Sequence, residues 1–455
     1  MTVESTDDAP PRSEAHAPRP AAVPPGERAL APDLARGLML LFIVLSNTAF
    51  HLTAARHGPS GWQPVDGGWA DHAVQFSMIT ALDLRVYPLF AFLFGYGMMQ
   101  LFLRQKAAGT SERDAVRLLR RRSLCLVVIG LLHATLLMGG DIVGFYGLIS
   151  LVLGWLFLRR GDRALTWWIW VAAAQYVLLA AQPVVEAALS GELGSLGDAG
   201  AEPGAEAYGA GEANWLTAAG TRFSTGLFVT FAAAPLSLVG GAYLIFLLGF
   251  WAARKRVLEE PARHLPLLRR TAVIGIAVGW LGALPSALAH VGVITVPDDA
   301  QSESGALTVL RDVTGNAAGL GYVAVVALFV AWWTRRGSRR AGRKAGAAVV
   351  ASTAVTAVSA VGKRSLSCYL AHSLLFAPVL AAWGLGLGEH LTSATMALFA
   401  VGVWLLTVAG AFAMERAGLR GPVEVALRWV MYRPRSPGKP GEAPSRGPRQ
   451  PVRQG

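Results

Sequence analysis

The stretch LCLVVIGLLHATLLMGGDIVGFYGLISLVLGWLFL, residues 124–158, decides the fold class of this chain. Two apolar runs of helix length flank a short Gly-Gly turn, which predicts two membrane-spanning helices joined as a hairpin. The hairpin carries His133 and Asp141. Because an ionisable group at the bilayer centre costs roughly 2.5–3.5 kcal/mol on insertion scales, we expect both side chains to face other helices or a water-filled cavity. They are the first candidates for function.

The composition extends this reading to the whole chain of 455 residues, which is 53% hydrophobic and only 15% charged. A water-soluble chain could not bury so much apolar surface. We predict an all-α, polytopic transmembrane helix bundle. About ten apolar runs are long enough to span a bilayer, at 36–54, 79–103, 123–139, 142–158, 166–185, 228–253, 271–293, 318–334, 365–385 and 393–414. Residues 346–361 form a further span, an interfacial helix or a re-entrant segment.

Charge in the connections orients the predicted bundle. Segments 104–122, 159–163, 254–270 and 335–344 are rich in Lys and Arg, whereas 186–222 carries six acidic residues and one arginine. Short basic loops stay in the cytoplasm. An even number of spans then places both termini in the cytoplasm.

The domain organisation follows from the same pattern. A transmembrane domain covers 28–433, with a flexible Gly- and Glu-rich outer loop at 189–216. The tails 1–27 and 434–455 lack periodicity and are expected to be disordered, the second being basic. The first apolar run is too long for a cleaved signal peptide and predicts a signal anchor. The net charge of +12 indicates anionic lipid as a partner and does not favour nucleic acid. The oligomeric state is left open.

Several polar residues fall near the outer ends of the predicted spans: Asn47, His51, Asp83, Arg85, His133, Asp141 and His290. Each has an ordinary alternative role. His51 and His290 could be hydrated side chains at the interface. Asp141 could cap the next helix, and Asp83 and Arg85 could neutralise each other.

A second group opens the span at 365–385 from the cytoplasm. Lys363 and Arg364 precede it, and Tyr369 and His372 follow on one helix face, since residues three apart are neighbours on a helix. Two cations at this entrance suit an anionic ligand such as a phosphate, but a positive-inside anchor needs the same residues.

Motifs along most of the chain resemble the YeiB-like family of bacterial inner-membrane proteins, over about residues 27–433. They are Asp33-Leu-Ala-Arg36-Gly37 with Asn47, Phe92-Leu-Phe-Gly95, Gly130-Leu-Leu-His133, Gly140-Asp141-Ile142 with Tyr146, Leu247-Leu-Gly249, Gly362 to Tyr369, and Gly421-Pro422-Val-Glu424 ahead of Arg428 and Tyr432. In that family the C-terminal part, here 236–433, is a domain of unknown function. The resemblance implies a multi-pass protein of the bacterial cell membrane.

The resemblance also implies two activities. Family members have been assigned to transport, and their architecture is similar to that of transmembrane acyltransferases, which pass an acyl group from cytosolic acyl-coenzyme A across the membrane. The first span, with Asp33, Arg36, Gly37 and Asn47, resembles the opening helix of the heparan glucosaminide acetyltransferase group.

The leading hypothesis is therefore a membrane acyltransferase. His133 would be the general base and Asp141 its orienting partner, because an imidazole can be tuned to titrate near neutral pH. Acyl-coenzyme A would be the donor, with its phosphates on Arg36, Lys363 and Arg364, and an envelope glycan or lipid the acceptor. The other candidates for substrate binding are Asn47, His51, Asp83, Arg85, Tyr146, Tyr369 and His372.

Two other functions stay open. The same histidine and aspartate could titrate in a proton-coupled transporter or exporter, or the chain could serve in signalling or envelope assembly without turnover. No metal-ligand spacing and no Gly-x-Ser-x-Gly nucleophile motif occur in the sequence, and we predict no metal site and no tightly bound cofactor.

Overall fold

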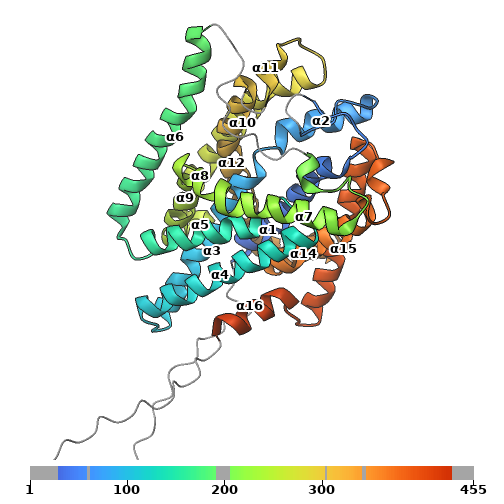
Figure 1. Cartoon of the computed structure of the whole chain (residues 1–455). Coiled ribbons are helices and arrows are strands. Elements are labelled where there is room, and N and C mark those ends of the chain that lie inside the picture. Colours follow the sequence, from blue (N-terminus) through green and yellow to red (C-terminus); the bar gives the residue numbers. More distant parts are fainter. Residues whose placement is uncertain (1–28, 59–61, 191–204, 303–304, 341–344, 433–455) are drawn as a thin grey trace, which may run out of the picture.

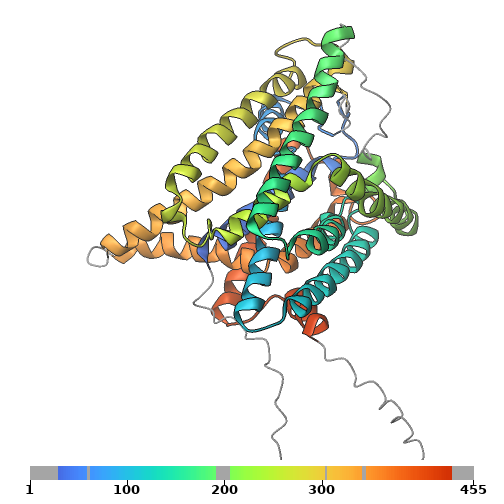
Figure 2. The same cartoon turned by 90° about the vertical axis from the view of Figure 1, so that its left-hand side faces the viewer.

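The computed structural model describes residues 29–58, 62–190, 205–302, 305–340 and 345–432. This part of the chain is almost entirely helical and contains no β-strand, only an isolated bridge between His57 and Pro64. Figures 1 and 2 show the helices gathered into one bundle, which confirms the all-α class. The predicted disordered tails, and 191–204 of the predicted outer loop, lie outside the described residues.

The helices are, in chain order, α1 (Leu30–Ser46), η2 (Asn47–His51), α2 (Trp69–Ala81), α3 (Val86–Ala107), α4 (Glu112–Leu136), α5 (Ile142–Phe157), α6 (Asp162–Ser190), η3 (Ala205–Tyr208), α7 (Trp215–Phe228), η4 (Val229–Ala233), α8 (Ala234–Val239), α9 (Tyr243–Arg254), η5 (Pro261–Arg263), α10 (Leu265–His290), α11 (Asp298–Gln301), α12 (Ala306–Arg340), α13 (Ala345–Lys363), α14 (Ser365–Leu380), η6 (Leu387–Glu389), α15 (Ser393–Arg416) and α16 (Pro422–Tyr432).

Seven stretches of the described chain are long and apolar enough to cross a membrane. They are 30–51, 86–107, 162–182, 215–239, 265–290, 306–336 and 393–416, and α5, α9 and α14 are shorter apolar helices. In the span formed by α6, only 11% of the most apolar window is buried, and Figure 1 shows this helix at the edge of the bundle. The chain is a multi-pass helical protein of membrane type.

One predicted span is wrong. The run 228–253 is interrupted, because a π-helical turn at Val229–Ala233 is followed by a break at Gly240 and Gly241. Gly241 has a φ of +84°, a backbone conformation that residues with a Cβ rarely adopt. The chain therefore changes direction there, and α9 begins as a separate helix at Tyr243.

The ambiguous segment 346–361 falls in α13, which packs along α1. Gly37 and Gly362 permit this approach: a Cβ at Gly37 would lie 2.1 Å from the Val358 carbonyl oxygen, and one at Gly362 would lie 1.8 Å from that of Asp33. Small residues let helix backbones approach closely within a membrane. The glycine that ends Asp33-Leu-Ala-Arg-Gly37 thus serves helix packing.

A close backbone approach and a buried hydrogen bond join the two helices of the α4/α5 hairpin. Gly130 packs against Gly144, where a Cβ on Gly130 would lie 2.1 Å from the Gly144 nitrogen. Buried Ser123 and Ser150 join the two helices by a hydrogen bond of 2.7 Å between their hydroxyl oxygens. These contacts hold the residues at the two ends of the turn close together.

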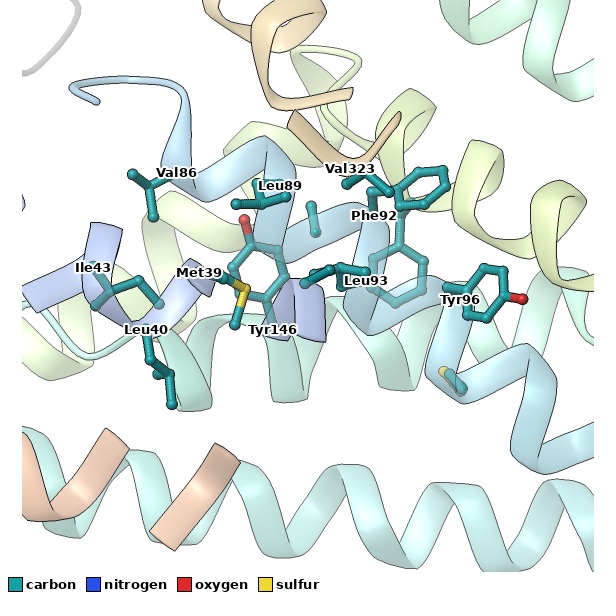
Figure 3. Packing of buried hydrophobic residues seen from close by; sticks show 14 of the residues in the cluster. Met39, Leu40, Ile43, Val86, Leu89, Phe92, Leu93, Tyr96, Tyr146 and Val323 are labelled. Carbon is teal, nitrogen blue, oxygen red and sulfur yellow. The ribbon is translucent and has the colours of Figure 1, made fainter. Parts of the chain in front are cut away.

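Behind the hairpin lies an apolar core shared by α1, α3 and α5. Figure 3 shows Tyr146 of α5 beside Met39 of α1 and near Leu89 and Leu93 of α3. The Tyr146 hydroxyl donates to the Tyr87 carbonyl oxygen at 3.0 Å, so the polar tip of this buried ring is satisfied. Tyr146 is therefore a core residue whose contacts position α5 against α3.

Candidate functional site

His133 and Asp141 meet across the turn of the hairpin. The distance from His133 Nδ1 to Asp141 Oδ1 is 2.7 Å, and both side chains are 2% exposed. The other carboxylate oxygen of Asp141 accepts the Gly144 backbone N–H at 2.6 Å and so caps α5. Asp141 thus has both roles that the sequence left open, as helix cap and as partner of the histidine.

The pairing with Asp141 determines the role of each ring nitrogen of His133. A carboxylate only accepts hydrogen bonds, so His133 donates from Nδ1–H, and the neutral form of the ring would carry its lone pair on Nε2. Nε2 is buried and has no hydrogen-bond partner in the described part of the chain. A neutral imidazole oriented by a carboxylate, with its second nitrogen available, is the arrangement of a general base.

Tyr369 of α14 completes this group. Its hydroxyl donates to Asp141 Oδ1 at 3.3 Å, and its ring lies 5.1 Å from the His133 ring between centroids. His372, one turn further on, points to a different neighbour: its Nε2 lies 2.9 Å from the Thr407 hydroxyl oxygen. The two residues that the sequence placed on one helix face therefore have separate roles, and only Tyr369 joins the His133 site.

A cleft of about 350 Å³ leads to Tyr369 from the end of the bundle where α16 lies. Its walls come from α1, α3, α4, α5, α13, α14 and α16, with Met39, Leu40, Leu126 and Val143 among its apolar lining. Ala29 and Tyr432 also line it, so the two ends of the described chain lie on the same side of the molecule.

The cleft is basic. Its lining includes five basic side chains, Arg36, Arg104, Arg122, Lys363 and Arg428, and two acidic ones, Asp33 and Glu424. Asp33 pairs with Arg36 at 3.0 Å. Arg122 lies over the Phe94 ring, 5.0 Å from its centroid, and makes no ion pair with another described residue. The net positive charge favours an anionic ligand at this end.

Helix α4 connects the cleft with His133. Arg122, Leu126, Gly130 and His133 are spaced by four, four and three residues, which places them along one helix face. At 1.5 Å per residue, the distance along α4 from Arg122 to His133 is about 16 Å. The charge pattern of the sequence places Arg122 in a basic connection, whereas the structure places it inside α4. Continuing the helical spacing backward from His133 would have identified it.

Lys363 and Arg364 differ in what they contact. Lys363 lines the cleft but pairs with Glu415, and Arg364, only 5% exposed, binds Glu415 at 2.8 Å and backbone carbonyls at Ala360 and Leu419. Arg364 does not line the cleft and instead joins the start of α14 to the end of α15. Of the three predicted phosphate ligands, Arg36 and Lys363 line the cleft and Arg364 does not.

Glu424 explains the Gly421-Pro422-Val-Glu424 motif. Its Oε1 accepts the backbone N–H groups of Leu366 at 2.9 Å and Ser367 at 3.1 Å, which caps α14. A Cβ at Gly421 would lie 1.9 Å from Glu424 Oε2. The motif therefore supports the helix that carries Tyr369.

Glu424→Ala is expected to lower the free energy of unfolding by about 0.5–2 kcal/mol, because it leaves two N–H groups at the start of α14 without acceptors. Glu389→Ala is the matched control, since the Glu389 side chain is exposed and makes no hydrogen bond with another described residue. Thermal unfolding in detergent compares the two variants. Equal melting temperatures would contradict the capping role.

None of the remaining predicted residues makes a hydrogen bond or ring contact with His133 in the described part of the chain. His51 is buried against Phe376, with 5.7 Å between ring centroids, and Asn47 is half-buried at the start of η2. Arg85 is fully buried and donates to the Gly279 carbonyl oxygen at 2.8 Å and to the backbone carbonyl of Asp83. Asp83 instead accepts from the Gln63 amide at 3.0 Å, so the two side chains do not form the ion pair that we considered.

Comparisons with known proteins find a matching family for the C-terminal part of the chain. Residues 252–434 match the family described as "Protein of unknown function (DUF418)". The chain is 28% identical over 226 residues to "Uncharacterized protein YxaH" of Bacillus subtilis (strain 168), a match covering 46% of this chain. The chain spans about half, 53%, of that relative's length. No solved structure matches. The family segment contains Tyr369 and Glu424 but not the His133–Asp141 hairpin.

Proposed function

We propose that this protein is a membrane acyltransferase that takes an acyl group from acyl-coenzyme A in the basic cleft and passes it to an acceptor near His133. The observation that carries the proposal is the connection between the basic cleft and the His133 site. The cleft ends at Tyr369, whose hydroxyl binds the carboxylate that orients His133. A charged mouth, an apolar interior and a general base thus follow one another through the bundle.

The mouth and walls of the cleft suit the donor. Coenzyme A combines phosphates with a long, narrow pantetheine arm. Arg122 and Arg428 lie on aromatic rings, which holds their guanidinium groups in place for charge-assisted hydrogen bonds. Leu126 and Val143, further in, would contact the apolar part of the arm and the acyl chain. Tyr369 stands between the inner end and His133, so its ring must rotate aside for transfer.

The chemistry uses the free nitrogen of His133. Nε2 removes the proton from an acceptor hydroxyl or amine as the acceptor atom attacks the thioester carbonyl carbon. The C–S bond breaks, the new acyl bond forms, and the imidazolium returns the proton to the leaving thiolate, which releases coenzyme A. Asp141 stabilises the imidazolium during this step.

The test is incubation of the purified protein in nanodiscs with radiolabelled acetyl-coenzyme A and a mixture of sugars and amines. We expect label to appear in the acceptor. If neither a labelled product nor binding of the donor is detected, the proposal is contradicted.

Donor binding gives a second, sharper prediction. Arg122→Ala is expected to weaken acetyl-coenzyme A binding roughly 10- to 100-fold, the loss of one charge-assisted hydrogen bond to phosphate. Arg117→Ala is the matched control, because Arg117 lies on the same helix, pairs with Asp114 at 2.7 Å and does not line the cleft. Isothermal titration calorimetry measures both. Equal affinities would place the donor elsewhere.

A proton-coupled carrier is the second candidate, and one observation favours it. Asp312 pairs with Tyr87 between α3 and α12, and Arg85 and Arg311, 0% and 4% exposed, lie in the same region. Buried ionisable groups within a membrane often mark ion or proton paths. Proton-dependent solute flux in proteoliposomes, lost in Asp312→Asn but not in His133→Ala, would support transport over acyl transfer.

A further inference from the structure

A group of polar side chains gathers at the far end of the bundle from the cleft, and no role assigned so far uses it. We call it the outer polar cluster: His51, Thr53, Glu212, Arg222 and Trp383. Arg222 lies over the Trp383 ring, 5.5 Å from its centroid, and Glu212 accepts a hydrogen bond from Thr221, the residue before Arg222. His51 lies within electrostatic reach of Arg222. The Thr53 side chain lies 3.6 Å from the position of a Cβ on Gly211, next to Glu212.

His51 and Arg222 are buried and the other three residues are half-buried, yet several polar atoms of the cluster are shielded from solvent without a hydrogen-bond partner in the described part of the chain. His51 is 5% exposed, and neither of its ring nitrogens has a hydrogen-bond partner among the residues that the structure describes. The same holds for Trp383 Nε1, Thr53 Oγ1 and Glu212 Oε2, although Glu212 Oε1 accepts from the Thr221 hydroxyl. Buried polar groups in proteins are nearly always hydrogen-bonded. Several unpartnered donors and acceptors in one place therefore indicate a bound polar molecule.

The cluster adjoins His133. Arg222 Nε donates to the Thr135 carbonyl oxygen at 3.1 Å, and its Nη2 lies 3.5 Å from that of Leu136, both in the last turn of α4. Tyr208 closes the other side: it stacks on Phe50 with 4.0 Å between centroids, and a Cβ on Gly140 would lie 2.2 Å from its ring. The cluster thus begins within one helical turn of the proposed base.

The chemistry of the cluster selects a ligand class. The cluster holds one cation, Arg222, and one anion, Glu212, so it offers no net charge for a phosphate. Its free atoms include N–H donors at Trp383 and His51 and an acceptor at Glu212, and hydroxyl groups can satisfy both kinds. Aromatic rings add flat apolar contact. A neutral molecule with several hydroxyls, such as a sugar, matches this set.

We propose that the outer polar cluster binds a neutral, hydroxyl-rich acceptor and presents one of its hydroxyls to His133. That the bound molecule is an acceptor rests on the proposed acyl transfer. Binding of the molecule to the outer polar cluster does not depend on that reaction. His51 and Trp383 are its binding residues, and Glu212 accepts a ligand hydroxyl.

The test measures binding of three probes, glucose, N-acetylglucosamine and glycerol 3-phosphate, to the full-length protein in nanodiscs by calorimetry. We expect the two neutral sugars to bind and the phosphate not to. His51→Phe and Trp383→Phe should weaken sugar binding at least about tenfold, as loss of a hydrogen bond to a buried group does. His390→Phe should not, because His390 is exposed and its side chain makes no hydrogen bond with another described residue.

Acetyl-coenzyme A binding, measured on the same samples, shows that each variant is folded and separates the two proposals. Donor binding without sugar binding, stronger binding of glycerol 3-phosphate, or sugar affinities equal in the variants and the wild type would each overturn the cluster proposal alone. Sugar binding that the variants lose, in a protein that does not bind acetyl-coenzyme A, would keep the sugar site and overturn acyl transfer.

Discussion

His133→Ala should lower the rate of acyl transfer by roughly 10²- to 10⁴-fold, the usual contribution of a general base. The cleft remains intact in this variant, because His133 does not line it. Acetyl-coenzyme A binding should therefore stay within about twofold of the wild type. Initial rates with radiolabelled acetyl-coenzyme A at saturating donor, together with calorimetry, measure the two effects separately.

Two companion variants sharpen this prediction. Asp141→Asn keeps the shape of the side chain but loses the negative charge that holds Nδ1–H, so a large loss of rate is expected there too. His390 is an exposed histidine, and His390→Ala should leave the rate of acyl transfer unchanged. Transfer at the wild-type rate in His133→Ala would remove His133 from the reaction, whatever the other two variants show.

Gly130→Ala should destabilise the protein and also lower its activity. The added Cβ would lie 2.1 Å from the Gly144 nitrogen and 2.4 Å from Asp141 Oδ2, so the hairpin must move apart and the dyad with it. Overpacking of this kind costs about 1–3 kcal/mol. Melting temperature in detergent and transfer rate are expected to fall together.

Gly402→Ala is the matched control for this variant. Gly402 also lies in a membrane helix, α15, but a Cβ there would meet nothing within 4 Å. It should leave both readouts unchanged or raise the melting temperature slightly, since alanine favours helix. A Gly130→Ala protein as stable and active as Gly402→Ala would show that the close approach of α4 and α5 is not needed.

The sequence was most informative for contacts between residues that lie close together in the chain. The helical hairpin of 124–158 could be predicted because two apolar runs of helix length flank a short turn and two ionisable groups stand out within it. As membrane-spanning helices the two runs are not confirmed, since α5 is a shorter apolar helix and α4 is not among the seven stretches. His133 and Asp141 flank one short turn, so their contact needs only the hairpin to form. Asp141 also caps α5, a role that depends on residues three apart.

Contacts between distant segments could not be predicted in the same way. The basic runs near Arg122 and Arg364 look alike in the sequence, yet one side chain lines the cleft and the other binds Glu415 and the Leu419 carbonyl. That difference depends on how α15 and α16 return to α14. Likewise, the break at Gly241 reflects a backbone conformation, and hydropathy does not report it.

Transfer across a bilayer tests the central claim, that the basic cleft and the His133 site form one route through the protein, most directly. Proteoliposomes are loaded with glucose and glucosamine, a hydroxyl and an amine acceptor, and radiolabelled acetyl-coenzyme A is added outside. Since coenzyme A does not cross lipid, only molecules with the cleft outward can react. The account predicts labelled product inside, lost in His133→Ala and reduced in Arg122→Ala at low donor concentration. Label that never reaches the interior, or that reaches it equally in His133→Ala, would contradict it.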